Sequence, residues 1–100
     1  MEAPSCFEDV VHSVVQELAE LLISKQKDYG HENITDFGEL GVLIRANDKI
    51  ARLKYLLSPF GEAKPKNESL EDSWKDLANY AIIALILRRN WFTLPLREDK

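Results

Sequence analysis

The stretch ESLEDSWKDLANYAIIALIL, residues 68–87, decides the fold. Its first half is acidic, and its second half is apolar on nearly every side. Because residues three and four apart share one face of a helix, Asp72, Asp76 and Asn79 form a polar line, which Glu68 extends by one turn. The line runs into residues 81–87, which are too apolar all round for a surface helix. The stretch therefore predicts a helix that enters the interior of a helical protein.

Asp76 is the residue in this stretch that most needs an explanation. It is flanked by Trp74, Leu77 and Ala78, so its carboxylate enters apolar surroundings. A buried carboxylate is costly unless it is paired or binds a cation. Two interpretations follow, a bound divalent metal or a buried salt bridge to an Arg or Lys of another helix. Spacing alone does not separate them.

Length and composition favour one small domain that shares its core with a second copy. One hundred residues, 45% of them hydrophobic, predict a single domain over residues 1–100. A chain this short buries only a modest fraction of its surface, so a homo-oligomer, dimer or tetramer, fits better than a monomer. The net charge of -4 argues against binding of a nucleic-acid polymer, which usually leaves a basic footprint. One bound nucleotide needs only a local cluster of cations.

Cysteine usage and the apolar runs indicate a cytoplasmic protein with no membrane partner. Cys6 is the only cysteine, which excludes an internal disulfide and a cysteine-based zinc site, and is typical of a reducing compartment. The first ten residues lack the pattern of a signal peptide. The longest apolar run, residues 81–87, is too short for a bilayer, which takes ~20 residues.

Three segments carry apolar residues at helical spacing. The first runs from about residue 6 to 29, with a capping box of Ser5 and Glu8 at its start and Gly30 as its C-terminal stop. The second runs roughly from 39 to 57, and the third begins at Asn67 or Ser69 and ends near residue 90. Residues 31–36 and 58–67 are expected to be loops. These segments predict an all-α bundle of three main helices with a short C-terminal tail, completed by oligomerisation.

The acidic cluster of the third segment points to a hard metal ion. Its members are Glu68, Glu71, Asp72 and Asp76. Oxygen ligands without a cysteine cluster favour Mg²⁺ or Mn²⁺ over Zn²⁺. Acidic residues in a first helical turn are also common as plain capping. Capping accounts for Glu68 and Glu71, and in part for Asp72, but not for Asp76.

A second cluster, Arg45-x-x-Asp48-Lys49-x-x-Arg52, lies on one face of the middle segment. It is either a set of surface ion pairs, each worth ~0.5 kcal/mol, or one further metal ligand, Asp48, beside cations that hold phosphate oxygens. Taken alone, the cluster favours the solvated face.

A third cluster closes the first segment, and its members are Lys25, Lys27, Asp28, Tyr29 and Gly30. A Lys near a helix C-terminus is favourable in any case, and a Tyr can stack on a base. Together the three clusters supply carboxylates for a metal, cations for phosphates and a ring for a base. These are the parts of a nucleotide phosphohydrolase.

Three motifs carry a resemblance to a known family: KDYG (27–30), GVLIRANDKIARL (41–53) and NESLEDSWKDLANYAI (67–82). In them the chain resembles the nucleotide modification associated domain 1 proteins, which are small and often phage-borne, over roughly residues 26–89. That family is placed with the all-α nucleoside triphosphate pyrophosphohydrolases, the MazG-like and dimeric dUTPase-like group. The resemblance implies a dimeric or tetrameric helical bundle that uses Mg²⁺ to cleave between the α and β phosphates.

Position by position, the resemblance makes Asp76 the closing Asp of the acidic motif, with Asp72 and Glu71 before it. Asp48 is then the carboxylate that the preceding helix supplies to the metal. MazG-like enzymes usually carry a glutamate-rich EExxE motif on that helix, whereas here Asp48 lies among cations, with Glu39 at the start of the segment. With fewer carboxylates on this helix, two outcomes stay open: the site holds one metal ion instead of two, or the protein binds a nucleotide without cleaving it.

We therefore expect a Mg²⁺- or Mn²⁺-dependent nucleoside triphosphate pyrophosphohydrolase in the cytoplasm of a bacterium or phage-infected host, acting on a plain or modified deoxynucleotide. The expected catalytic residues are Asp48, Asp72 and Asp76, which with Glu71 hold the metal; the expected nucleotide and phosphate contacts are Lys27, Tyr29, Arg45, Lys49, Arg52, Asn79 and Tyr80. One alternative is an oligomer, or a small partner subunit, that binds or sequesters a nucleotide without cleaving it. The other is a structural bundle in which the charges form interhelical ion pairs.

Overall fold

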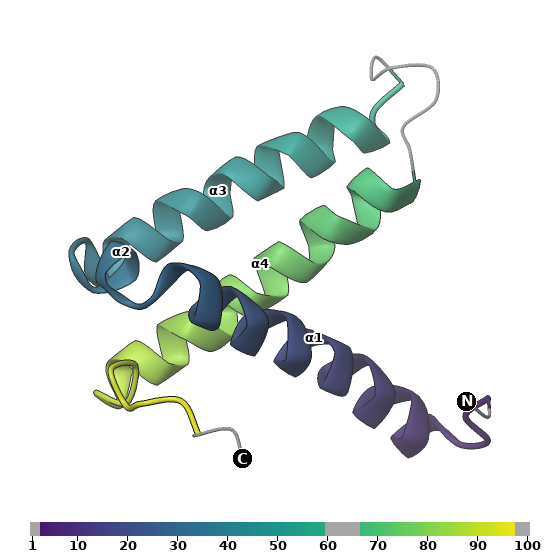
Figure 1. Ribbon diagram of the computed structural model, residues 1–100. Helices are drawn as coiled ribbons and strands as arrows, with labels where there is room; N and C mark the ends of the chain where they lie inside the picture. Colours follow the sequence, from purple (N-terminus) through teal and green to yellow (C-terminus); the bar gives the residue numbers. More distant parts are fainter. Residues whose placement is uncertain (1–2, 60–66, 98–100) are drawn as a thin grey trace. The chain divides into compact units, whose positions relative to one another are not determined.

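The computed structural model describes residues 3–59 and 67–97, with the backbone alone for residues 67–69. All regular structure in these ranges is helical, and none of it is strand. The helices are α1 (Phe7–Tyr29), α2 (Glu32–Thr35), α3 (Gly38–Leu57) and α4 (Asn67–Arg88) (Figure 1). This confirms the all-α fold class. In the described ranges no helix has both the length and the apolar character that crossing a membrane requires.

The chain divides into two compact units, Met1–Gly30 and His31–Lys100. Within the first unit, α1 begins after Cys6, whose backbone is extended and whose side chain makes no capping hydrogen bond. The predicted capping box of Ser5 and Glu8 is therefore wrong. The helix begins one residue later, so Glu8 lies in its first turn, where the helix dipole favours a carboxylate. The expectation of one domain over residues 1–100 stays a prediction.

Gly30 ends α1 as predicted. Its φ of 71° lies in the left-handed region, and its N–H donates to the Gln26 carbonyl oxygen at 2.9 Å. Glycine adopts this conformation without the penalty that a Cβ brings. The glycine at this position therefore accounts for the end of α1.

Residues 31–36 were expected to be a loop, and that expectation is wrong. The second unit opens with α2, a single helical turn, in which the Asp36 N–H donates to the Glu32 carbonyl oxygen at 2.9 Å. The Thr35 hydroxyl also donates to that oxygen, at 3.3 Å. A helix of one turn is too short to show a hydrophobic period, so the polar sequence of this segment is typical of a loop.

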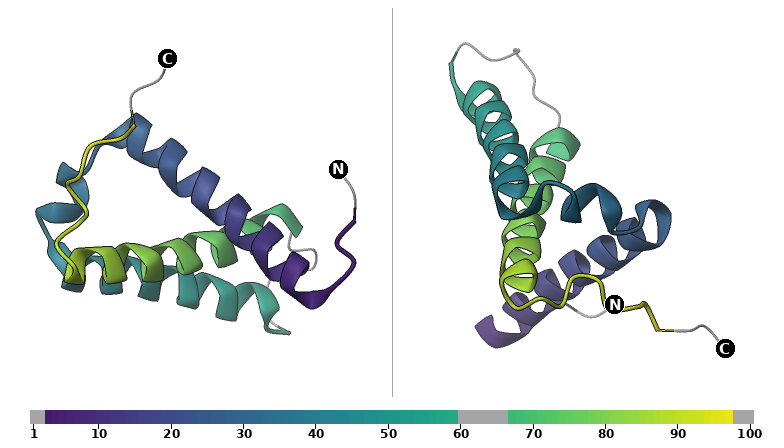
Figure 2. Two further views of the ribbon diagram at one scale, coloured as in Figure 1. Left: turned by 90° about the horizontal axis from the view of Figure 1, so that it is seen from below. Right: turned by 90° about the vertical axis from the view of Figure 1, so that its left-hand side faces the viewer.

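The long helices α3 and α4 run antiparallel and lie side by side in all views (Figures 1 and 2). Both ends of each helix lie within about two residues of their predicted positions. The buried apolar side chains among the described residues are Val42, Leu53, Ile83 and Phe92. Phe92 comes from the C-terminal tail, so part of that tail is buried. The pair therefore has a thin core, and much of its apolar surface stays exposed.

Candidate functional site

An ion pair joins α3 to α4 at the middle of their polar faces. The Lys49 Nζ lies 2.9 Å from the Asp76 Oδ2, and the side chains are 29% and 17% exposed respectively. A charge-assisted contact of this length is stronger than one between neutral groups. Because the pair is partly buried, removing either partner leaves a desolvated charge, which costs about 1–3 kcal/mol.

The sequence left two interpretations of Asp76, a bound metal or a salt bridge to another helix. The ion pair with Lys49 is such a salt bridge. It accounts for the partly buried carboxylate of Asp76 without a metal. The assignment of Asp76 as a metal ligand stays a prediction. If both interpretations apply, a metal at Asp76 has to share or replace the contact with Lys49.

The remaining predicted metal ligands do not gather around Asp76 into a protein-only cage. Asp48 and Asp72 are exposed, and Glu71 pairs with Lys75 on its own helix at 3.1 Å. Among the side chains that the structure describes, no group of three or more His, Cys, Asp or Glu residues could hold a metal ion. The side chain of Glu68 lies outside the described set. These residues therefore suit only a metal that takes part of its ligands from a bound molecule, as Mg²⁺ does with phosphates.

The predicted phosphate-binding cations of α3 share one face, and the structure gives them different surroundings. The Arg45 guanidinium donates to the Asn33 Oδ1 at 2.9 Å, which ties α3 to α2. Lys49, one turn further along, reaches Asp76. Arg52 and Asp48 are exposed, as the solvated-face interpretation expects for them. The cluster is thus anchored at two cations and open to solvent at the third.

Asn79 and Tyr80 follow Asp76 by about one turn and lie in different environments. Asn79 is only 5% exposed, so it is part of the interior. Tyr80 is half-buried and lines an apolar groove. Ser73 is also buried, at 2% exposure. Sequence reasoning missed Ser73, although its place beside Asp72 in the polar half of the helix was a usable signal.

Lys27 and Tyr29 belong to the other unit. Both are exposed in the last turn of α1. Lys27 is the basic residue of that turn, where the helix dipole favours a cation. Their assignment as nucleotide contacts stays a prediction.

A second ion pair joins the far ends of α3 and α4 and was not predicted. The Arg88 Nη1 donates to both carboxylate oxygens of Glu39, at 2.9 and 3.0 Å. Both side chains are more than half exposed. The two pairs, at Lys49–Asp76 and Glu39–Arg88, link the helices at two points of one antiparallel register.

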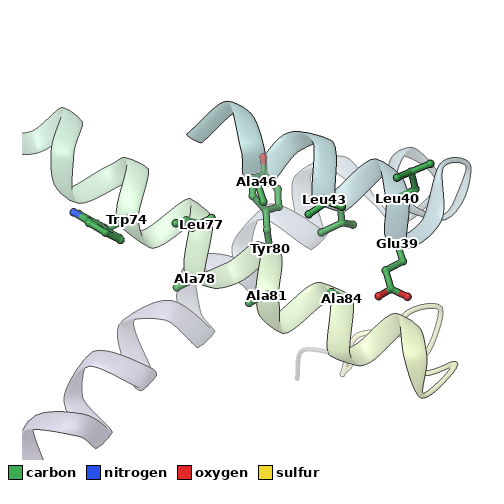
Figure 3. Close-up of a pocket in the computed structure, with 11 residues that line it drawn as sticks. Glu39, Leu40, Leu43, Ala46, Trp74, Leu77, Ala78, Tyr80, Ala81 and Ala84 are labelled. Atoms are coloured by element: carbon green, nitrogen blue, oxygen red, sulfur yellow. The ribbon is translucent and has the colours of Figure 1, made fainter. Parts of the chain in front are cut away.

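An apolar groove of about 810 Å³ runs along α3 and α4. Figure 3 shows Leu40, Leu43 and Ala46 of α3 on one side and the α4 residues from Trp74 to Ala84 on the other. Among the described residues that line it, Glu39 alone is charged, and its carboxylate is bonded to Arg88. Asp76 is not part of the lining. The groove and the Lys49–Asp76 cluster are therefore separate features of one helix pair.

Together these features define an all-α protein in which two antiparallel helices carry a mixed cluster of cations and carboxylates. The family model named nucleotide modification associated domain 1 matches residues 25–87, and the chain belongs to this family. The match takes in α2, α3 and nearly all of α4, and with them the Lys49–Asp76 ion pair. No curated protein and no solved structure matches the chain.

Proposed function

We propose that the chain binds a nucleoside triphosphate at the polar face of α3 and α4 and, with Mg²⁺ or Mn²⁺, converts it to the monophosphate and pyrophosphate. The observation that carries the proposal is the Lys49–Asp76 ion pair, a cation and a carboxylate held together inside the segment that matches a nucleotide-related family. The substrate we expect is a deoxynucleotide, plain or modified. Placement with the MazG-like enzymes is part of the same proposal.

The cations of α3 supply the phosphate contacts. Arg45, Lys49 and Arg52 share one helical face. Their positive charges offset the repulsion between a carboxylate-rich surface and an incoming polyphosphate. Lys49 has a double role, because its ammonium group already holds Asp76 in place. A phosphate oxygen therefore competes with Asp76 for this one ammonium group.

The carboxylates of α4 supply the acidic half of the site. Asp72 and Asp76 are one turn apart on one face. Mg²⁺ is often held by one or two carboxylates together with substrate phosphates, so the two side chains suffice when the metal arrives with the nucleotide. When bound, the ion neutralises phosphate charge and lowers the pKa of a bound water. Asp48 adds a further carboxylate from α3.

A second candidate function is binding of a nucleotide without cleavage, by the oligomer or as a small partner subunit. Two observations favour it. The described side chains form no group of three metal-binding residues, and the most buried carboxylate of the cluster is already neutralised by Lys49. Under this alternative the cations of α3 still hold phosphates, and the bound nucleotide stays intact.

A chromatographic screen separates the two functions. Common and modified nucleoside triphosphates are incubated with the protein and Mg²⁺ or Mn²⁺, and monophosphate and pyrophosphate are measured. Turnover that stops on addition of a chelator supports the hydrolase. Binding of a nucleotide in equilibrium dialysis, with no product after long incubation, supports the alternative. If the protein neither binds nor converts any nucleotide of the panel, both functions are contradicted.

A further inference from the structure

The single-turn helix α2 touches the cation cluster of α3 at one residue. The Asn33 Oδ1 accepts a hydrogen bond from the Arg45 Nη2 at 2.9 Å. Both helices belong to the same compact unit and are in contact (Figure 1). Arg45 lies one turn before Lys49 on the face that carries the cluster. Asn33 therefore holds one of the cations that the proposed function assigns to phosphate, and that function gives Asn33 no part of its own.

The junction between α2 and α3 allows the two helices to approach closely. Gly38, the first residue of α3, has a φ of 63°, in the left-handed region that glycine adopts without a Cβ penalty. At Gly41, a Cβ would collide with the Cβ of Phe37, the residue that precedes α3. The chain can therefore turn tightly between the helices, and Asn33 reaches a side chain two turns into α3.

Asn33 holds Arg45 without cancelling its charge. Its amide oxygen is uncharged, whereas two carboxylates lie at the ends of α2, those of Glu32 and Asp36. The hydrogen bond of the guanidinium nevertheless goes to the amide. Lys49 is in the opposite situation, because its ammonium group is paired with a carboxylate. Arg45 thus keeps a positive charge that can attract a phosphate.

The bond to Asn33 also orients the donors that remain on Arg45. A guanidinium is planar and carries five N–H donors in a rigid fork, so holding one of them sets the direction of the others. Asn33 takes one donor, at Nη2. Two parallel N–H donors suffice for a bidentate contact with a phosphate. Arg45 can therefore bind a phosphate while Asn33 stays in place, and its side chain has less freedom to lose on binding.

We propose that Asn33 is a positioning residue of the phosphate site, which orients the Arg45 guanidinium and leaves its charge for a polyphosphate ligand. The inference rests on the proposed nucleotide function. The competing explanation is a purely structural tie of α2 to α3. A carboxylate at position 33 would tie Arg45 at least as firmly, through a charge-assisted bond, but it would neutralise the charge. The substitution Asn33→Asp therefore separates the two explanations.

The test measures the binding of inorganic tripolyphosphate with Mg²⁺ by isothermal titration calorimetry. This probe carries the phosphates of a nucleoside triphosphate without its base and sugar. Asn33→Asp should bind about 10-fold more weakly than the native chain, as expected for one opposing charge close to the phosphate. Asn33→Ala removes the orientation but adds no charge, so it should bind only about 2- to 5-fold more weakly.

Asn47→Asp is the matched control for net charge. Asn47 is exposed like Asn33, and it lies two residues from Arg45 on α3, a spacing at which side chains do not face each other. Its affinity should remain within about 2-fold of the native value, because an exposed charge is screened. Thermal unfolding supplies the second readout. Asn33→Asp should unfold at the native temperature or above, since it keeps a bond from α2 to Arg45, and a merely structural tie does not predict weaker binding in a variant of native stability.

Two results would overturn the inference in different ways. If Asn33→Asp binds as tightly as the control, or loses affinity only in step with its unfolding temperature, the inference fails and the nucleotide function stands. If the native chain binds no tripolyphosphate, the phosphate site of α3 fails, and the proposed function and the inference fail together.

A double variant checks that the effect passes through Arg45. In an Arg45→Gln background at low ionic strength, where the other cations of the cluster attract the probe most strongly, Asn33→Asp should reduce affinity no more than Asn47→Asp does. Two side chains that act through one contact give such non-additive losses. The same loss from Asn33→Asp in both backgrounds contradicts the inference.

Discussion

The two faces of α4 differ in a way that reverses the usual division between inside and outside. On the face toward α3 a carboxylate, Asp76, is only 17% exposed. On another face, at the apolar groove, the indole of Trp74 is 53% exposed. A partly buried charge and exposed large apolar side chains are the informative departures in a small protein. The first is the basis of the proposed nucleotide site, and the second leaves an apolar part of the same helix in contact with solvent.

The largest expected effect is at the inner face. Asp76→Ala should abolish metal-dependent turnover, with a loss of at least about 100-fold, because the site loses its most buried carboxylate. Helical content should stay native. Product release from a panel nucleotide, followed by chromatography, measures the effect. Asp36→Ala, an exposed acid at the end of α2, serves as the control, and turnover at the native rate in Asp76→Ala would remove Asp76 from the site.

A smaller effect is expected for the cation of the inner pair. Lys49→Met should lower the free energy of unfolding by about 1–3 kcal/mol, because it removes the ammonium group that faces the partly buried Asp76 carboxylate. Thermal and urea unfolding measure the loss. The double variant Lys49→Met with Asp76→Asn should recover part of it, as a coupled pair requires. Strictly additive losses would show that the two side chains do not stabilise each other.

The smallest effect is at the exposed pair. Glu39→Gln should change the free energy of unfolding by no more than about 1 kcal/mol, because the Glu39–Arg88 contact is exposed to solvent and screened by salt. Urea unfolding at low and high ionic strength measures it. A loss as large as that of Lys49→Met would mean that burial does not distinguish the two ion pairs.

The fold was predictable from the sequence because its long helices carry a clear apolar period. The bounds of α1, α3 and α4 follow from that period and from Gly30. Helix α2 was missed because one turn is too short to show a period. The capping box failed because Ser5 and Cys6 are adjacent, and propensity alone does not decide which residue carries the extended backbone.

The site was predictable only in part. Spacing identified Asp76 as a carboxylate that needs a partner, and it identified the cations of α3. Spacing could not show that Lys49, and not Arg45 or Arg52, is the partner of Asp76. All three cations share a face, and the partner depends on how α3 is rotated against α4. The Glu39–Arg88 pair depends on the same register. The groove could not be predicted for the same reason, since its lining depends on which faces α3 and α4 turn toward each other.

The most direct test of the division between the two faces is a nuclear magnetic resonance titration. ¹⁵N-labelled protein is titrated with non-hydrolysable α,β-methylene deoxynucleoside triphosphates and Mg²⁺. The account predicts shifts of the backbone amides around Lys49 and Asp76, while the indole N–H of Trp74 stays unchanged. Shifts at the Trp74 indole, with the amides of Lys49 and Asp76 unmoved, would contradict it.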